Sequence, residues 1–293
     1  MLIYLFLFNS NISFRYGITL NDILRGVNDT TNSALLTGLL LAEGRAPAIK
    51  GTTCQMHAQE LVVQHAFGLR KRRKNGDDID KFEPGSLLAK KVRVLVSKIM
   101  DKRSKNKFTK YIEYCSKDLM TEVNRLVIPN DTRVSGVFLM FQSVLRSRNC
   151  IMMYTTVSSE RAVYKDINLD DLDWQFIAET HCILKVTNVL AMTSQQQSVE
   201  SNCFSYYHVV SARYYLKNSL EFPVIDLKND RWKPTTEVSK IPTTLISKDN
   251  LMGSTIQLIE RFEKEFLHYF KSPDSDQILM MVFHPLMSWM GFE

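Results

Sequence analysis

Apolar residues recur at a period close to 3.6 between residues 87 and 270, and no other feature of the sequence constrains the fold as much. Residues at this spacing form a stripe along one side of an α-helix, and the stripe has to be buried against other elements. The predicted helices cover residues 87–100, 108–127, 133–148, 172–192, 204–216 and 252–270. We therefore expect the second part of the chain to be dominated by helices.

The part of the chain before residue 70 has a different pattern. Residues 2–8 are rich in aromatic and β-favouring side chains and predict a buried strand, and residues 31–43 have helical spacing after a capping stretch. A further helix is predicted to end near Gly68 and to carry four residues on one face: Leu61, Val62, His65 and Leu69. Because the character of the sequence changes here, we place a domain boundary near residue 70, between domains 1–70 and 71–293.

Three stretches are predicted to be loops because Gly, Pro, Asn and Asp cluster in them. They are residues 76–85, 128–132 and 221–242. The last is long for a loop in a compact domain, and such stretches are usually functional or without fixed structure.

The composition describes a globular chain that works in a reducing compartment. With 293 residues, of which 45% are hydrophobic, the chain can bury a sizeable core. The five cysteines are odd in number and widely scattered, so we expect reduced thiols that are mostly buried. No uncharged apolar run reaches the roughly 20 residues that a membrane span needs, so we expect no contact with a membrane.

Positive charge is concentrated in residues 70–110. This segment has 15 Lys or Arg and 5 acids, a net charge of 15 − 5 = +10, whereas the whole chain has +6 and the remainder therefore −4. Clustered basic residues are typical of a surface that contacts nucleic-acid phosphates, and the alternative is a solvated helix face. The basic run at residues 70–74 also predicts import into the nucleus.

Two further groups of residues could carry chemistry. Cys54 and His57 have the spacing of metal ligands, but a structural zinc site needs four ligands, so a buried Cys and a hydrogen-bonded His at the start of a helix are the favoured interpretation. Asp29 follows an apolar residue at the expected end of a strand, where a carboxylate could face a metal ion. On spacing alone, its favoured role is to cap the following helix. His181 and Cys182 are expected to be core residues.

Taken in order, several elements resemble the central part of hAT-type DNA transposases, which have a ribonuclease H-like fold. Residues 27–32 (Val-Asn-Asp-Thr-Thr-Asn) resemble the family's strand-ending Asp followed by Asn, and Asp29 would be its second metal-binding carboxylate. Residues 54–63, about two dozen positions further on, resemble its Cys-x-x-His and apolar helix. Residues 88–100 followed by 107–112 resemble the family's helices before the target stretch, and residues 130–133 followed by 138–148 resemble its Thr-Arg-Trp segment and next helix. Residues 283–286 resemble a short Pro-containing segment.

The departures from the family pattern bear on activity. Val134 stands where the family has a Trp that stacks on a base, no Asp precedes Asp22 to serve as the first carboxylate, and the third acid and the dimerisation segment are expected beyond residue 293. Two-metal phosphoryl chemistry needs several converging carboxylates, so we expect DNA cleavage to be lost and oligomerisation to be undetermined. Mg²⁺ or Mn²⁺ would be bound, at Asp29, only if activity remains.

The resemblance therefore implies an α/β, mainly helical protein, with a partial ribonuclease H-like sheet in residues 1–70 and a large all-α insertion domain in 71–293. Its expected partner is double-stranded DNA, and its expected compartment is the nucleus. The alternatives are a non-catalytic helical module that binds nucleic acid or protein, and an unrelated all-α interaction protein. The predicted DNA-binding residues are Arg70, Lys71, Arg72, Arg73, Lys74, Lys102, Arg103, Lys105, Lys107 and Arg133.

Overall fold

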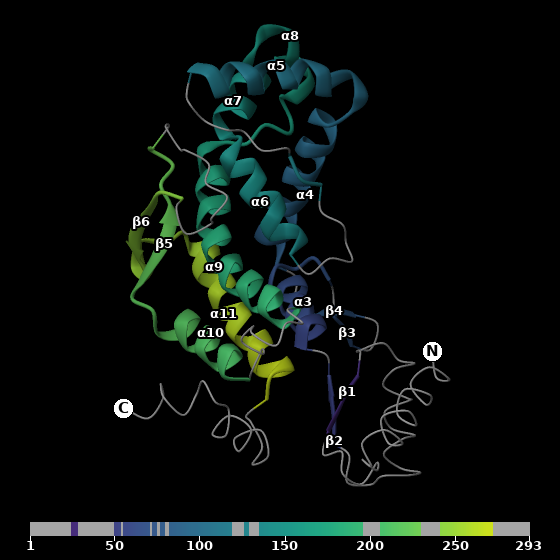
Figure 1. The fold of residues 1–293 in the computed structure, drawn as a ribbon, viewed down its shortest axis with the longest axis vertical. Coiled ribbons are helices and arrows are strands. Elements are labelled where there is room, and N and C mark those ends of the chain that lie inside the picture. The colour runs from purple at the N-terminus through teal and green to yellow at the C-terminus, as the bar shows by residue number, and fades with distance from the viewer. Residues whose placement is uncertain are drawn as a thin grey trace, which may run out of the picture. The chain divides into compact units, whose positions relative to one another are not determined.

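The fold is mainly helical, as the periodicity predicts (Figure 1). The computed structural model describes residues 25–28, 50–53, 55–70, 72–74, 77–79, 82–118, 126–128, 135–195, 206–229 and 241–271. The chain divides into two compact units, residues 1–58 and 59–293. This division lies within the first described helix, about a dozen residues before the boundary that the sequence predicts.

The first unit contains a parallel pair of strands. β1 (Arg25–Asn28) pairs with β2 (Lys50–Thr53), and Asn28 lies opposite Thr53. Parallel strands need a long crossover connection, and the 21 residues of 29–49 provide one. The predicted strand over residues 2–8 and the predicted helix over 31–43 lie outside the described residues.

Helix α3 (Gln55–Ala66) ends at a glycine, as the sequence predicts. Gly68 has a φ of +72°, which L side chains rarely adopt, and a Cβ there would lie 2.6 Å from the carbonyl oxygen of Phe82. Val62 is completely buried on the predicted face, but Leu69 is 40% exposed. The prediction for Leu69 was wrong because the helix ends before that residue.

A short hairpin replaces part of the loop predicted at residues 76–85. β3 (Arg72–Lys74) pairs antiparallel with β4 (Asp77–Ile79), with Lys74 opposite Asp77. The sequence between the strands is Asn75-Gly76, and Asn-Gly is the dipeptide that most strongly favours a two-residue hairpin turn. This signal was present in the sequence and the loop prediction overlooked it.

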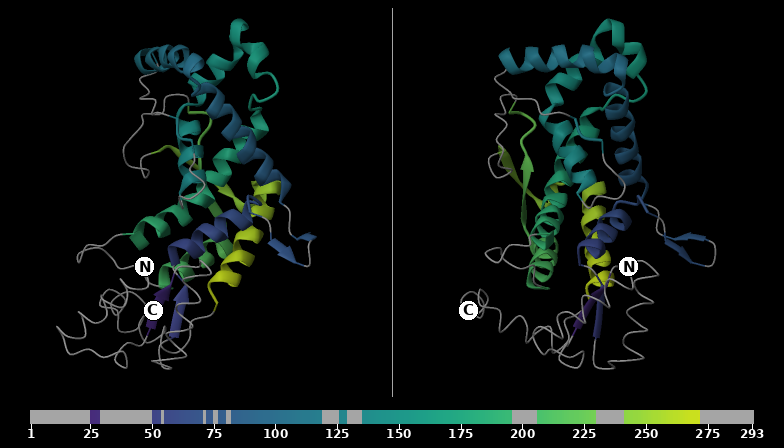
Figure 2. Two further views of the ribbon diagram at one scale, coloured as in Figure 1. Left: turned by 90° about the vertical axis from the view of Figure 1, so that its right-hand side faces the viewer. Right: turned by 45° about the vertical axis from the view of Figure 1, so that its right-hand side comes forward.

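Helix α9 (Asp171–Gln195) is the central element of the helical unit. It contacts α6 (Gly136–Arg146), α10 (Tyr206–Asn218) and α11 (Gly253–Tyr269), and α4 (Glu83–Ile99) contacts α6 and α11 (Figures 1 and 2). The core between these helices is rich in large apolar side chains, including Leu95, Phe141, Trp174, Phe262 and Phe266. Each of these helices overlaps its predicted range.

Three further helices form a group at one end of α4 (Figure 1). They are α5 (Lys102–Asp118), α7 (Arg148–Thr156) and α8 (Ser158–Tyr164), and α7 contacts both of the others. The single helix predicted over residues 133–148 is interrupted at Ser147, where α6 ends and α7 begins. α8 was not predicted at all, since seven residues are too few to establish a period.

One strand of a further pair lies within the range predicted to be a long loop at residues 221–242, and its partner strand begins directly after that range. β5 (Glu221–Ile225) pairs antiparallel with β6 (Thr243–Ser247) and packs on α9. Phe222 and Val224 are buried in alternation, the pattern of a half-buried strand. The loop prediction was wrong here because Pro223 counts against a strand, yet proline is tolerated in an edge strand.

Candidate functional site

The structure describes only part of the predicted functional set. Asp29, Cys54, Lys71 and Arg133 lie outside the described residues, so their roles stay predictions. His57 is half-buried in the first turn of α3, and Arg70 is exposed after the end of that helix. The remaining predicted positions fall on β3 and on α5.

The two parts of the basic segment have different surroundings. In the β3–β4 hairpin, Arg73 stands opposite Asp78 and Lys74 opposite Asp77, so acidic residues face two of the basic positions in the strand register. In α5, basic residues occupy 102, 103, 105, 107, 110 and 117 and acids only 113 and 118, a net charge of 6 − 2 = +4. The stronger positive potential is therefore expected along α5.

Aromatic packing fixes which side of α5 faces the solvent. Phe108 is 2% exposed, and its ring lies 5.4 Å from that of Tyr154 on α7. Tyr111 adds a second edge-on contact to Tyr154 at 5.3 Å. Lys105 and Lys110 are exposed.

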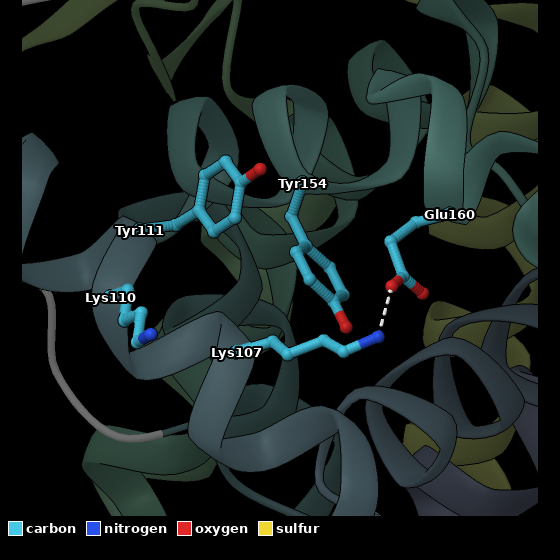
Figure 3. Close-up of a pocket in the computed structure, with 5 residues that line it drawn as sticks. All are labelled: Lys107, Lys110, Tyr111, Tyr154 and Glu160. Carbon is cyan, nitrogen blue, oxygen red and sulfur yellow. Dashed lines mark hydrogen bonds and ion pairs between the residues drawn. The ribbon is translucent and has the colours of Figure 1, made fainter.

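A small pocket of about 200 Å³ lies between α5, α7 and the start of α8. It is lined by Lys107, Lys110, Tyr111, Tyr154 and Glu160. Figure 3 shows the Tyr154 hydroxyl pointing toward the ammonium group of Lys107, whereas the Tyr111 hydroxyl points away from it. The pocket thus combines two cations, one carboxylate and two phenols.

An ion pair joins α5 to α8 at this pocket. Lys107 Nζ donates to Glu160 Oε1 at 2.7 Å (Figure 3). The Glu160 side chain is only 10% exposed, whereas that of Lys107 is 64% exposed. The hydrogen bond to Glu160, reinforced by the opposite charge, raises the pKa of Lys107 above its usual value, so this side chain is charged throughout the neutral range.

A buried tyrosine, Tyr154, lines the pocket. Tyr154 is completely buried, and its hydroxyl forms a side-chain hydrogen bond with that of Tyr164. The neighbouring ring of Tyr164 lies 5.5 Å away, and burial raises the pKa of Tyr164 to about 12. The Tyr164 hydroxyl therefore stays protonated at neutral pH.

Two other classes of site were sought in the part of the chain that the structure describes. No group of three or more His, Cys, Asp or Glu residues is arranged to hold a metal ion there. No described helix is both long and apolar enough to cross a membrane. His181 and Cys182 are buried, as predicted for core residues, and neither Cys150 nor Cys182 forms a disulfide.

Sequence reasoning identified only the α5 side of the pocket. Lys107 was a predicted DNA-binding residue, and Lys110 was counted in the basic segment. Tyr154 and Glu160 were missed, since they come from helices without a strong period and lie more than 40 positions away in sequence. No protein-family model matches the chain, and no curated protein or solved structure matches it.

Proposed function

We propose that this protein binds double-stranded DNA in the nucleus and derives from a hAT-type transposase that has lost DNA cleavage. The observation that carries DNA binding is the exposure of Lys105, Lys107 and Lys110 on α5, a helix with a net charge of +4. Lysines on a helix that is held by buried aromatic residues can contact phosphates and release the condensed counterions. Phosphate contacts of this kind position a protein on DNA without selecting a sequence.

The descent from a transposase is supported by the first unit. In a ribonuclease H-like fold we expect parallel strands joined by a crossover, and β1 and β2 are parallel strands with a 21-residue connection. Asp29 and Cys54 are the residues that follow the paired ends Asn28 and Thr53. The carboxyl ends of parallel strands are the usual location of functional residues in α/β proteins.

The proposed loss of DNA cleavage is supported by the metal-binding carboxylates that the resemblance identifies. Asp29 is the residue that resembles one of the family's metal-binding carboxylates, whereas a two-metal centre needs several carboxylates around ions about 4 Å apart. Asp29 by itself does not hold a pair of Mg²⁺ or Mn²⁺ ions, so we derive no cleavage step. The proposal therefore concerns DNA binding.

The proposal is tested by measuring the affinity of the full chain for duplex DNA at several salt concentrations. A variant with Lys105→Gln and Lys110→Gln is compared with a charge-matched control, Lys228→Gln and Lys271→Gln, whose lysines are exposed on other elements. Each lysine that contacts a phosphate is expected to contribute about 1 unit to the slope of log affinity against log salt.

The α5 variant is expected to have a slope shallower by about 2 units, and the control is expected to keep the slope of the unmodified protein. Equal slopes for the two variants would mean that binding follows net charge and not α5. Affinity that is independent of salt, or too weak to measure at low salt, would contradict DNA binding altogether.

A further inference from the structure

The β5–β6 pair has two outer edges, and among the described residues no third strand pairs with either of them. An edge strand presents a row of N–H and C=O groups without partners, and folded proteins usually protect such a row. β5 packs on α9, and β6 lies beside β5 (Figure 1). Thr243, Thr244 and Leu245 of β6 are exposed, and Leu245 reaches 64%. The edge of β6 is therefore accessible to a partner.

The hydrogen bonds at the two ends of the pair establish which backbone groups point outward. The N–H of Asp226 donates to the carbonyl oxygen of Pro242 at 3.1 Å, and that of Lys248 donates to the carbonyl oxygen of Leu220 at 2.9 Å. In an antiparallel ladder, hydrogen-bonded positions alternate with positions whose N–H and C=O point away from the paired strand. The even-numbered positions of β6 therefore bond to β5, and the odd-numbered ones present their backbone groups outward.

The two strands differ in how their outer edges are protected. Pro223 of β5 is also at an odd-numbered position, so the outward side of that strand lacks an N–H at its centre. The outward-pointing residues of β6 are Thr243, Leu245 and Ser247, none of them proline or charged. Pro242 and Lys248 flank β6, but their backbone groups bond to β5. They leave the outer edge of β6 open to an extended chain.

The sequence of β6 is complementary to a second copy of itself. In two antiparallel copies related by a two-fold axis at Leu245, the two Leu245 residues oppose each other and Thr243 opposes Ser247. Cross-strand apolar pairs and Thr–Ser pairs stabilise a sheet. This register pairs every outward-pointing residue, and it places Lys248 opposite Pro242 and not opposite a second lysine. A two-fold interface uses the same surface of both copies, as this register requires.

We propose that the outer edge of β6 pairs with the same edge of a second copy of this chain. The two β5–β6 pairs then form one continuous antiparallel sheet in the order β5–β6–β6–β5, with the exposed Leu245 at its centre. Strands of five residues bury less than the roughly 1,200 Å² of a stable interface. The association is therefore weak, with a dissociation constant on the order of 100 µM.

The first experiment is sedimentation equilibrium of the full chain without DNA, at concentrations from about 10 µM to 1 mM. The unmodified chain is expected to show a monomer–dimer equilibrium. Leu245→Lys places like charges opposite each other and is expected to weaken association at least about ten-fold. The matched control is Leu172→Lys on α9, whose leucine is also 64% exposed, and it should associate like the unmodified chain. Equal association of the two variants, or a chain that stays monomeric, would overturn the proposal.

A mixture of two variants tests the register itself. Leu245→Lys and Leu245→Glu should each remain monomeric alone, and their mixture should form a dimer because opposite charges then stand across the two-fold axis. A mixture that stays monomeric, with both variants keeping the urea unfolding midpoint of the unmodified chain, would contradict pairing at Leu245.

Amide hydrogen exchange tests the same edge without any substitution. The amides of Thr243, Leu245 and Ser247 should exchange more slowly as the concentration of the unmodified chain rises. Those of Thr244 and Ile246 bond to β5 and should be protected equally at all concentrations. Exchange at the first three residues that does not depend on concentration would overturn pairing between copies and leave the edge to an extended segment of another protein. None of these measurements needs DNA, so a failure of the proposed DNA binding leaves them valid.

Discussion

Helices α9 and α5 belong to the same unit, but they use their polar residues in opposite ways. In α9, Glu179, Thr180 and His181 are at most 2% exposed. In α5, Lys105, Lys107 and Lys110 are exposed, while Phe108 packs against α7. The first arrangement binds parts of the protein to one another, and the second leaves charge available for a partner.

Glu179 shows what a buried polar residue does in this fold. Its carboxylate accepts hydrogen bonds from the backbone N–H of Met252 at 3.0 Å, from the Thr255 hydroxyl at 2.5 Å and from the Gln175 amide at 2.8 Å. Met252 is the N-cap residue of α11 and makes no side-chain cap of its own. Glu179 of α9 therefore caps α11 from a distance in sequence of more than 70 residues. The contrast with α5 teaches that burial, and not charge, separates structural from accessible polar residues here.

The largest effect is expected from Glu179→Ala, which should lower the free energy of unfolding by about 3 kcal/mol because three donors, one of them the buried Thr255 hydroxyl, lose their acceptor. The matched control is Glu113→Ala on the exposed side of α5, with an expected change within about 0.5 kcal/mol. Urea denaturation of both variants measures the difference. Similar losses for the two variants would remove the distinction between the helices.

The next effect concerns His181. Burial lowers the pKa of this histidine to about 3, and the positive charges of Lys185 and Arg146 contribute to the decrease. Its ring stays neutral and stacks on Phe138 with the centroids 4.7 Å apart. The unfolded chain binds a proton at this residue below a pH of about 6.5, whereas the folded chain does not. Stability is therefore expected to fall as the pH drops below that value, by about 1.4 kcal/mol per pH unit for this group.

His181→Gln should remove this contribution to the pH dependence, and His268→Gln, at an exposed position of α11, should leave it in place. Thermal or urea unfolding between about pH 6.5 and 4.5 measures the slope for each protein. A His181→Gln variant with the same slope as the unmodified protein would mean that this histidine does not stay neutral on folding.

The smallest effect is expected from the ion pairs. Lys91 and Asp173 join α4 to α9 at 2.5 Å, with side chains 30% and 21% exposed, and a double-mutant cycle to alanine should give a coupling of about 1 kcal/mol. The Lys107–Glu160 pair should couple more weakly, because Lys107 is 64% exposed. The cycles are repeated at 1 M salt, where screening should reduce the Lys107–Glu160 coupling by the larger fraction. A stronger coupling in the α5 pair would contradict the comparison.

The fold was predictable from the sequence wherever the residues of a single element show a characteristic pattern. The apolar residues of α4, α9 and α11 predict those helices to within a few residues, and Gly68 predicts the end of α3. The sequence did not predict the β5–β6 pair because the two strands are separated by 17 residues. They are stabilised by pairing with each other, and β5 also packs on α9. A local pattern cannot represent a contact of that kind.

The candidate site divides in the same way. The charge density of residues 70–110 identified Lys105 and Lys107 in advance. It did not distinguish the hairpin, where Asp77 and Asp78 stand opposite basic residues, from α5. Tyr154 and Glu160 join the site only because α7 and α8 turn back against α5.

The sequence by itself determined that this chain is mainly helical, that its positive charge is concentrated in one segment, and that His181 and Cys182 belong to the core. The tertiary structure decided which charges stay exposed, that Glu179 caps α11, and that a pocket forms around Tyr154 and Glu160. The physical reason is that periodicity and charge density are properties of neighbouring residues, whereas burial and pairing depend on which helices meet in space.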